Sequence, residues 1–447
     1  MHHKDRLRNS PSGTVPRAGI FVLEMALVFA LILLLITPGQ AQTYRVIYTF
    51  DTGLNAWDAG VGLSIDAAGN LYGTTIRGGG QGDCPAPGGC GAVFQLIPNG
   101  SDWVETLLHG FNGPYDFGRG PGPFGATDGA YPYSRAMVGP DGNVYGTVLE
   151  GATSDAGAVY QLTRSGSSWN RTILHRFTGG ADGIHPFGDV AFDATGNLYG
   201  TTTIGGAYRW GTIFLLAPSA SGWTKTTLYN FRGGSDGAWP YSGVLLDGAG
   251  NLYGTTGAGG SDDCDYDGPN CGTVYQLSPS GSGWTEKILY NFHNGNDGNH
   301  PSALIFDQAG NLYGTICGGS HGGASVFRLS PSGQNWNFEV VYTLSATSCA
   351  PFLGSLAMDD TGNLYGALVD GGAYSRGSIY KLTRAGSSWW YTDLYDFTGG
   401  SDGGEPNGSL VLDSNGNLYG TTQYGGVSHY CGGAFHTGCG VVFQLTP

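Results

Sequence analysis

Residues 196–202 read GNLYGTT, and the chain repeats this phrase almost unchanged. GNLYG or GNVYG occurs seven times, with its asparagine at Asn70, Asn143, Asn197, Asn251, Asn311, Asn363 and Asn417. Successive asparagines lie 52 to 73 residues apart, and three of the intervals are 54 residues. A unit of this length buries its apolar face only against neighbouring copies. The phrase therefore predicts a repeat architecture.

Each unit has the pattern of four short strands separated by turn residues. In the third unit these are DVAFD (189–193), LYGTT (198–202), GTIFLL (211–216) and WTKTTLYNF (223–231). Apolar and β-branched residues between clusters of Gly, Asn, Asp and Ser indicate strands and hairpins. No helical period occurs after the first 41 residues, so the sequence predicts an all-β chain of four-stranded antiparallel β-propeller blades.

The two ends of the repeat region predict a closed ring. Tyr44–Phe50 (YRVIYTF) matches the fourth strand of a unit, and Gly440–Thr446 (GVVFQLT) matches a third strand. The first segment can therefore complete the last blade, which removes exposed sheet edges. An open solenoid would need capping repeats, and none is visible. We expect a seven-bladed propeller over residues 42–447, closed by strand 44–50.

The first 41 residues have the composition of a signal peptide. The apolar run Met25–Ile36 follows a basic segment and precedes Gly39-Gln40-Ala41, a small-residue cleavage site. The rival interpretation is a membrane anchor, but Glu24 limits the run to fewer than the roughly 20 residues that span a bilayer. We expect cleavage after Ala41, no membrane span afterwards, and a secreted protein, extracellular or periplasmic. The basic residues are Lys4, Arg6, Arg8 and Arg17.

Charge and composition limit the classes of partner that the chain can bind. The net charge is −15, and no Lys/Arg cluster remains beyond the leader, so we expect no nucleic-acid partner. The 82 glycines and the low charged content of 12% could signal disorder, but aromatic residues recur in register at 13%. We expect a folded monomer.

The repeat also resembles known families. The order LYG…GG…GxVFxL…W is similar to the Kelch-type propeller repeat. More closely, YGTTTIGGAYRWGTIFLLAP (199–218) resembles the Gloeo-Verruco (GloVer) tandem repeat of secreted bacterial proteins. The resemblance covers nearly all of residues 44–447. It implies a bacterial, secreted protein but no established activity.

Eight cysteines follow the leader, and three pairs lie in the three enlarged loops between second and third strands. Because each pair occurs together with an insertion, we expect each to close its own loop and the remaining two cysteines to pair with each other. Zinc is the alternative, but its usual CxxC and HxxxH spacings are absent. Disulfides suit an oxidising compartment. The expected pairs are Cys84/Cys90, Cys264/Cys271, Cys431/Cys439 and Cys317/Cys349.

Candidate binding residues lie in a frame, DGxxP, that recurs between units on the face where the loops vary in length. The simpler interpretation is a turn in which Asp caps, Gly supplies a positive φ and Pro ends it. The residue before Pro varies, however, and variable aromatic, imidazole and carboxylate groups on a rigid ring suit a carbohydrate or protein ligand. These candidates are Tyr131, His185, Trp239, His300 and Glu405.

A calcium loop is the one cofactor site that the sequence suggests. Asp263, Asp265 and Asp267 stand two residues apart and are followed by Gly268, the oxygen array with which a Ca²⁺ loop begins. Position 12 of that loop is Val274 rather than a bidentate Glu, so a complete EF-hand is excluded. The alternatives are a looser extracellular calcium loop and a solvated acidic tip.

Three functions remain open at this point. The leading one is a secreted, non-enzymatic propeller that binds a carbohydrate or protein on its loop-rich face. The second is a carbohydrate-active or lactone-type enzyme with an acidic centre at the propeller mouth, for example Asp182 with Asp402. The third is a structural surface or matrix protein. No G-x-S-x-G, HExxH or P-loop motif occurs, so we assign no catalytic residue.

Overall fold

The computed structural model describes residues 42–51, 58–79, 89–112, 129–151, 155–260, 271–293, 295–318, 323–344, 355–386, 388–426, 431 and 438–447. All of these except Gln42 belong to one compact unit, Thr43–Pro447. The expected signal peptide lies outside the described residues. Within the described ranges, no helix has the length and apolarity that crossing a bilayer requires.

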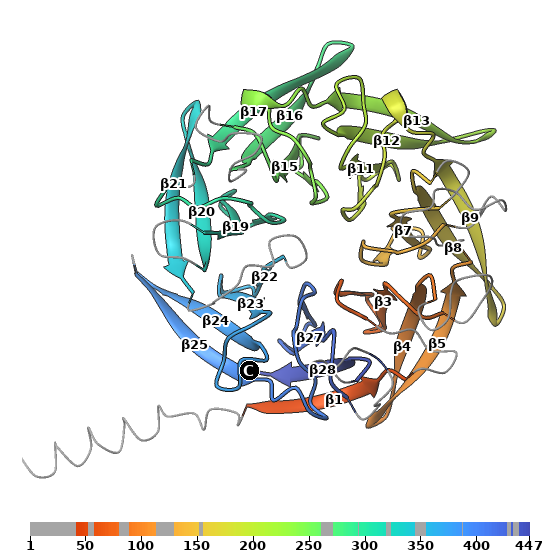
Figure 1. Cartoon of the computed structure of the whole chain (residues 1–447), viewed down its shortest axis with the longest axis vertical. Coiled ribbons are helices and arrows are strands. Elements are labelled where there is room, and N and C mark those ends of the chain that lie inside the picture. Colours follow the sequence, from red (N-terminus) through yellow and green to blue (C-terminus); the bar gives the residue numbers. More distant parts are fainter. Residues whose placement is uncertain are drawn as a thin grey trace, which may run out of the picture. The chain divides into compact units, whose positions relative to one another are not determined.

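The described strands form seven four-stranded antiparallel sheets arranged in a ring (Figure 1). The innermost strands are β2 (Leu63–Ile65), β6 (Met137–Val138), β10 (Ala191–Phe192), β14 (Leu245–Leu246), β18 (Ile305–Phe306), β22 (Ala357–Met358) and β26 (Val411–Leu412). The second strands are β3 (Leu71–Thr75), β7 (Val144–Val148), β11 (Leu198–Thr202), β15 (Leu252–Thr256), β19 (Leu312–Cys317), β23 (Leu364–Leu368) and β27 (Leu418–Thr421).

The third strands are longer: β4 (Ala92–Asn99), β8 (Ala158–Ser165), β12 (Thr212–Ser219), β16 (Thr273–Ser280), β20 (Ala324–Ser332), β24 (Ser378–Ala385) and β28 (Val441–Thr446). The outer strands are β5 (Asp102–Gly110), β9 (Ser168–Arg176), β13 (Gly222–Asn230), β17 (Gly283–Asn291), β21 (Asn335–Thr343), β25 (Ser388–Asp396) and β1 (Thr43–Thr49). Two 3-10 turns, η2 (Gly180–Asp182) and η3 (Gly234–Asp236), precede blades 3 and 4. Blades are numbered 1 to 7 from β2.

The predicted closure of the ring is confirmed. Strand β1 pairs antiparallel with β28, from Thr43 opposite Thr446 to Thr49 opposite Val441. Blade 7 is thus built from both ends of the repeat region, and the β1 edge lies beside β28 in Figure 1. The innermost strands are shorter than predicted. Near the axis, main chains of adjacent blades approach each other so closely that a side chain on Gly243 would meet the Asp189 carbonyl.

The glycine of the LYG phrase makes room for an aromatic ring. Gly200 on β11 lies opposite Phe214 on β12, and a Cβ built on Gly200 would be 2.6 Å from Phe214 Cζ. The same pairing recurs in every blade, and these aromatic residues are almost completely buried. The remaining pairs are Gly73/Phe94, Gly146/Tyr160, Gly254/Tyr275, Gly314/Phe327, Gly366/Tyr380 and Gly420/Phe443.

The asparagine of the phrase belongs to a turn organised by an aspartate. Asp193 Oδ1 accepts hydrogen bonds from the main-chain N–H groups of Thr195 and Asn197, both at 2.9 Å. Its Oδ2 accepts from Asn197 Nδ2 at 2.8 Å and from the Tyr199 hydroxyl at 3.1 Å. In blade 2, where Gly139 replaces the aspartate, Asp141 accepts from Asn143 and Tyr145 instead. The repeated asparagine is therefore a structural residue.

Threonine hydroxyl groups of the repeated LYGT sequence form hydrogen bonds between neighbouring blades. Thr201 Oγ1 donates to the Ser242 carbonyl of blade 4 at 2.9 Å, and Thr255 Oγ1 donates to the Ser302 carbonyl of blade 5 at 3.1 Å. These hydroxyls are buried, so each satisfies its own polar atom while joining two sheets.

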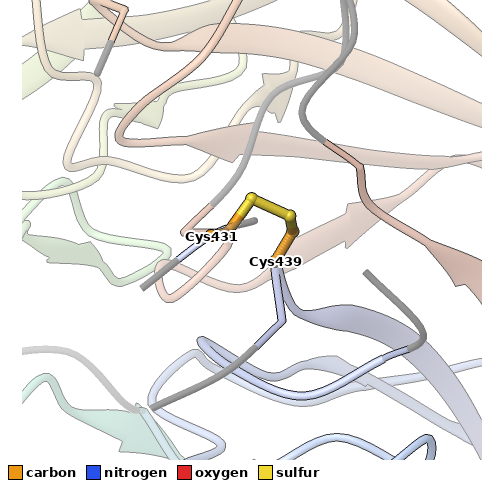
Figure 2. Close-up of a disulfide and its surroundings, with 2 residues drawn as sticks. All are labelled: Cys431 and Cys439. Carbon is orange, nitrogen blue, oxygen red and sulfur yellow. A yellow bond between two sulfur atoms is a disulfide. The ribbon is translucent and has the colours of Figure 1, made fainter. Parts of the chain in front are cut away.

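One of the expected disulfides is fully described. Cys431 and Cys439 are bonded across the loop that precedes β28 (Figure 2). Cys90, Cys271 and Cys317 are disulfide-bonded too. Their expected partners Cys84, Cys264 and Cys349 lie outside the described residues, so those pairings stay predictions.

We expect Gly200→Ala to lower the free energy of unfolding by about 1–3 kcal/mol, because the added methyl must displace the Phe214 ring in a packed core. The matched control is Gly248→Ala, since nothing lies within 4 Å of a Cβ there and φ is not positive. Urea unfolding of both variants, followed by tryptophan fluorescence, measures the difference. Equal midpoints would contradict the role assigned to the LYG glycine.

Candidate functional site

The DGxxP frame forms the predicted turn. Asp182 Oδ2 accepts a hydrogen bond from Thr178 N at 2.9 Å, and it lies 3.0 Å from His175 Nε2. Lys225 Nζ, on β13 of blade 3, lies 3.0 Å from Asp182 Oδ1. Gly183 follows with φ of 100°. The hydrogen bonds from Lys225 and Thr178 hold the pKa of Asp182 below its ordinary value although burial opposes them.

All five pre-proline candidates adopt a left-handed backbone, with φ between 46° and 58°. This conformation is uncommon for residues with a side chain, and tertiary contacts maintain it. His185 shows how: its N–H donates to the Ala156 carbonyl of the preceding blade, and its carbonyl accepts from Thr203 N of its own blade, both at 3.0 Å. The pre-proline residue thus joins two blades through its main chain.

The proline of the frame packs against a glycine of the preceding blade. A Cβ on Gly157, the residue that opens β8, would lie 2.6 Å from Pro186 Cδ. Gly211 and Pro240 repeat this contact one blade further on. The glycine and the proline are therefore two halves of one contact between blades.

Two of the five candidate side chains, Trp239 and Glu405, contact side chains of the preceding blade. Tyr131 is buried and the other four are half-buried or nearly so. The Trp239 ring centre lies 5.9 Å from that of Trp210, and Glu405 Oε1 lies 3.8 Å from Arg376 Nη1. Burial lowers the pKa of His185 and of His300, which favours neutral imidazoles.

A pocket lies on the propeller axis, and in blades 2 to 4 the residue that follows the frame proline lines it. Its cavity volume is about 30 Å³, and the empty space rises to about 360 Å³ only when the open mouth is included. Each blade contributes to its wall immediately before the innermost strand. One lining residue per blade, in chain order, is Val61, Tyr133, Phe187, Tyr241, Ala303, Ser355 and Ser409.

Three consecutive blades give the pocket an aromatic wall. Tyr133 and Phe187 stack with ring centres 4.9 Å apart and planes 18° apart. Phe187 and Tyr241 meet edge-on with centres 5.8 Å apart. We call Tyr133, Phe187 and Tyr241 the aromatic arc. The sequence shows it as YPY, HPF and WPY, but the sequence-based prediction selects the residue before the proline rather than the residue after it.

The wall opposite the arc is small and polar. Ser355 donates from its N–H and its hydroxyl to Ser409 Oγ, both at 3.0 Å, which joins blades 6 and 7. A pocket with one aromatic wall and one hydroxyl wall can stack an apolar ligand face while hydrogen-bonding its polar edge.

An ion pair joins blades 2 and 3 beside the pocket, and of its two members Asp189 is a lining residue while Arg135 is not. Asp189 lines the pocket, and its Oδ2 lies 2.7 Å from Arg135 Nε. Asp189 Oδ1 accepts from the Arg135 main-chain N–H at 2.7 Å. The side chains are 21% and 26% exposed for Arg135 and Asp189, so the pair is partly desolvated but reachable. Charged residues at these two non-frame positions carried no sequence signal, because they belong to no motif that the units repeat.

A buried carboxyl group stands where blade 1 lacks the frame. Asp58 occupies the pre-proline place there, with φ of 68°, and Ala59 replaces the proline. Asp58 is 7% exposed, and its Oδ1 has no hydrogen-bond partner among the described residues. Burial raises the pKa of Asp58 to about 6, although Arg77 and a hydrogen bond from Gln423 lower it in part.

The predicted calcium residues Asp263, Asp265 and Asp267 lie outside the described residues. In the part of the chain that the structure describes, no three His, Cys, Asp or Glu side chains are grouped as metal ligands.

The repeat family described as Gloeobacter/Verrucomicrobia repeat matches residues 122–315 and 317–447, so this chain is a β-propeller of that family. No curated protein matches the sequence.

The chain is similar to several solved structures. A Lactobacillus plantarum protein is 16% identical, with a TM-score of 0.46 over 79% of this chain and 95% of its own. A Bacteroides uniformis protein assigned provisionally as a 6-phosphogluconolactonase is 13% identical, with a TM-score of 0.46 over 79% and 95%. A Thermus thermophilus protein assigned provisionally as a glucose dehydrogenase is 16% identical, with a TM-score of 0.41 over 70% and 96%. Likenesses of this size carry no argument about activity.

We expect Asp58→Asn to stabilise the protein above pH 6. The pKa of Asp58 rises from 3.8 to about 6 on folding, so its contribution to stability is fully present below about pH 4 and is lost as the pH rises through 6. Asn tolerates the left-handed backbone and cannot ionise. At pH 7.5 the variant should gain about 1–3 kcal/mol in free energy of unfolding.

At pH 4 the Asp58→Asn variant and the wild type should unfold alike, and this comparison is the internal control. Calorimetric scans from pH 4 to pH 8 give both curves. A stability gain that does not change with pH would contradict the shifted ionisation.

Proposed function

We propose that the protein is a secreted, non-enzymatic β-propeller that binds a carbohydrate in the axial pocket of its loop-rich face. The aromatic arc carries this proposal. Sugar rings present C–H groups on one face and hydroxyls around the edge, and an aromatic wall facing a serine wall complements both. A protein ligand that inserts one side chain is the other member of this binding class.

The pre-proline residues enter the proposal as support. Tyr131, His185, Trp239, His300 and Glu405 fix the path of the chain into the pocket wall through their left-handed backbone. Binding residues on loops held by a rigid scaffold lose little conformational freedom when the ligand arrives. Secretion is supported by the signal-peptide pattern and by the disulfide between Cys431 and Cys439.

The enzymatic alternative needs two carboxyl groups that face each other across the mouth. Asp402 Oδ2 accepts from Thr398 N at 2.8 Å and from the Tyr395 hydroxyl at 3.1 Å, and Asp182 is held in a similar way. Both therefore act as turn caps. Asp189 is the carboxylate among the described pocket residues, and it is paired with Arg135. No observation favours a second function.

We expect a glycan array probed with fragment 42–447 to give carbohydrate binding that depends on the arc. Tyr133→Ala and Tyr241→Ala should each weaken binding about tenfold or more, because a stacked aromatic contact is lost. Tyr374→Ala is the control, since Tyr374 is 59% exposed and outside the pocket lining. Absence of any glycan signal, or equal losses in all three variants, would overturn the proposal.

A calcium site at Asp263, Asp265 and Asp267 is a separate proposal from sequence. Titration calorimetry of fragment 42–447 should show Ca²⁺ binding with a dissociation constant on the order of 10⁻⁴–10⁻³ M, as in extracellular modules. Asp265→Ala should abolish the heat. Asp102→Ala, an exposed aspartate on β5, should leave it unchanged. If the wild-type protein gave no heat of Ca²⁺ binding, the proposed calcium site would be wrong.

A further inference from the structure

We propose that the Arg135–Asp189 pair, of which Asp189 lines the axial pocket, recognises two adjacent hydroxyl groups of an uncharged sugar bound at the open mouth of that pocket. This inference rests on the proposed carbohydrate function and narrows its ligand class. Stacking on the aromatic arc accepts any ring with an apolar face, so the polar groups beside the arc must decide which sugar binds.

The pair is fixed in place before a ligand arrives. Asp189 accepts from Arg135 twice, once from the main-chain N–H and once from Nε, and both distances are 2.7 Å. Because one of these bonds comes from the main chain, the carboxylate stays oriented even when the guanidinium moves. A site ordered in advance avoids much of the entropic cost of binding.

The pair also keeps unused hydrogen-bonding capacity. Among the described residues, the terminal nitrogens of Arg135 make no hydrogen bond, and each Asp189 oxygen accepts only one from Arg135. A guanidinium offers donors in a planar fork, and a carboxylate oxygen can accept more than one hydrogen bond. A hydroxyl donates and accepts at once. Two neighbouring hydroxyls therefore match a donor group that lies beside an acceptor group.

The charges favour a neutral ligand. Arg135 and Asp189 cancel each other, while the whole chain carries a net charge of −15. A sugar acid would meet Asp189 and the negative field of the chain, and a cationic sugar would meet Arg135. The position is consistent with the arc: Arg135 and Asp189 each follow a ring of the arc by two residues, Tyr133 and Phe187.

Titration calorimetry with defined glycosides tests this inference. The probes are the methyl glycosides of mannose, galactose and glucose, each beside an analogue that lacks one of two adjacent hydroxyls, and methyl glucuronide as the acidic probe. Arg135→Lys keeps the charge and the main-chain bond but loses the planar fork. Asp189→Asn keeps one acceptor. Arg164→Lys, on the exposed β8–β9 hairpin, is the matched control.

We expect at least one neutral glycoside to bind. Arg135→Lys and Asp189→Asn should each weaken it about tenfold, and the deoxy analogue should bind wild type and both variants alike, because the contact is already absent. Arg164→Lys should behave as wild type. Affinity should change little between about 50 and 500 mM salt, since no net charge is paired.

The inference would be overturned if the affinity lost in a variant and the affinity lost with the deoxy analogue added together. It would also be overturned if the glucuronide bound more tightly than the neutral glycosides and its binding depended on salt. Failure of every neutral glycoside to bind would overturn it as well. Thermal unfolding shows whether each variant is folded. If Asp189→Asn is unfolded, the binding data for Arg135→Lys test the inference on their own. If array binding depends on Tyr133 and Tyr241 but ignores Arg135 and Asp189, the inference fails while the proposed function stands. If no glycan binds, both fail.

Discussion

The close approach of an aromatic ring to a glycine is the constraint on which each blade depends. Phe214 lies across Gly200, and a Cβ there would come within 2.6 Å of the ring. The ring therefore lies over the second strand, in one core cluster with Leu198 of β11 and with Val190, the residue before β10. Because the innermost strand β10 has only two residues, it has few ladder hydrogen bonds of its own. Its position depends on this packing and on the aspartate-centred turn that precedes β11.

Contacts between blades are made mainly by main-chain atoms and small residues. The larger side chains at these junctions therefore differ from blade to blade. The Gly157–Pro186 contact and the hydrogen bonds of His185 use backbone atoms and a ring without polar groups. The side-chain partner at the same junction changes around the ring. Lys225 neutralises Asp182 at one junction, whereas at the next Glu286 approaches Asp236, and burial together with that charge raises the pKa of Glu286 to about 8. Variation at these positions leaves the propeller intact.

The sequence predicted the ring and its closure because these depend on local periodicity, which a repeat shows seven times. It predicted the DGxxP frame as a turn for the same reason. It did not find the axial pocket. Tyr133, Phe187 and Tyr241 come from separate units, and only the convergence of blades at the axis brings them together. Asp58 was missed because blade 1 lacks both the Asp-Gly and the Pro of the frame, so its left-handed backbone left no local pattern.

Asymmetry at the axis is what separates a binding site from a filled core. Seven equal units would give seven equal lining residues, and such a ring could not orient a ligand. Here the arc belongs to blades 2 to 4, serines face it from blades 6 and 7, and one ion pair stands between blades 2 and 3. The arc residues contact one another across blades 2 to 4, and glycine, proline and threonine contacts join the blades as well. Three partly exposed rings at one mouth leave apolar surface in contact with water. A ligand of the proposed kind, with an apolar face, would cover that surface, and the asymmetric polar groups would then determine how it lies.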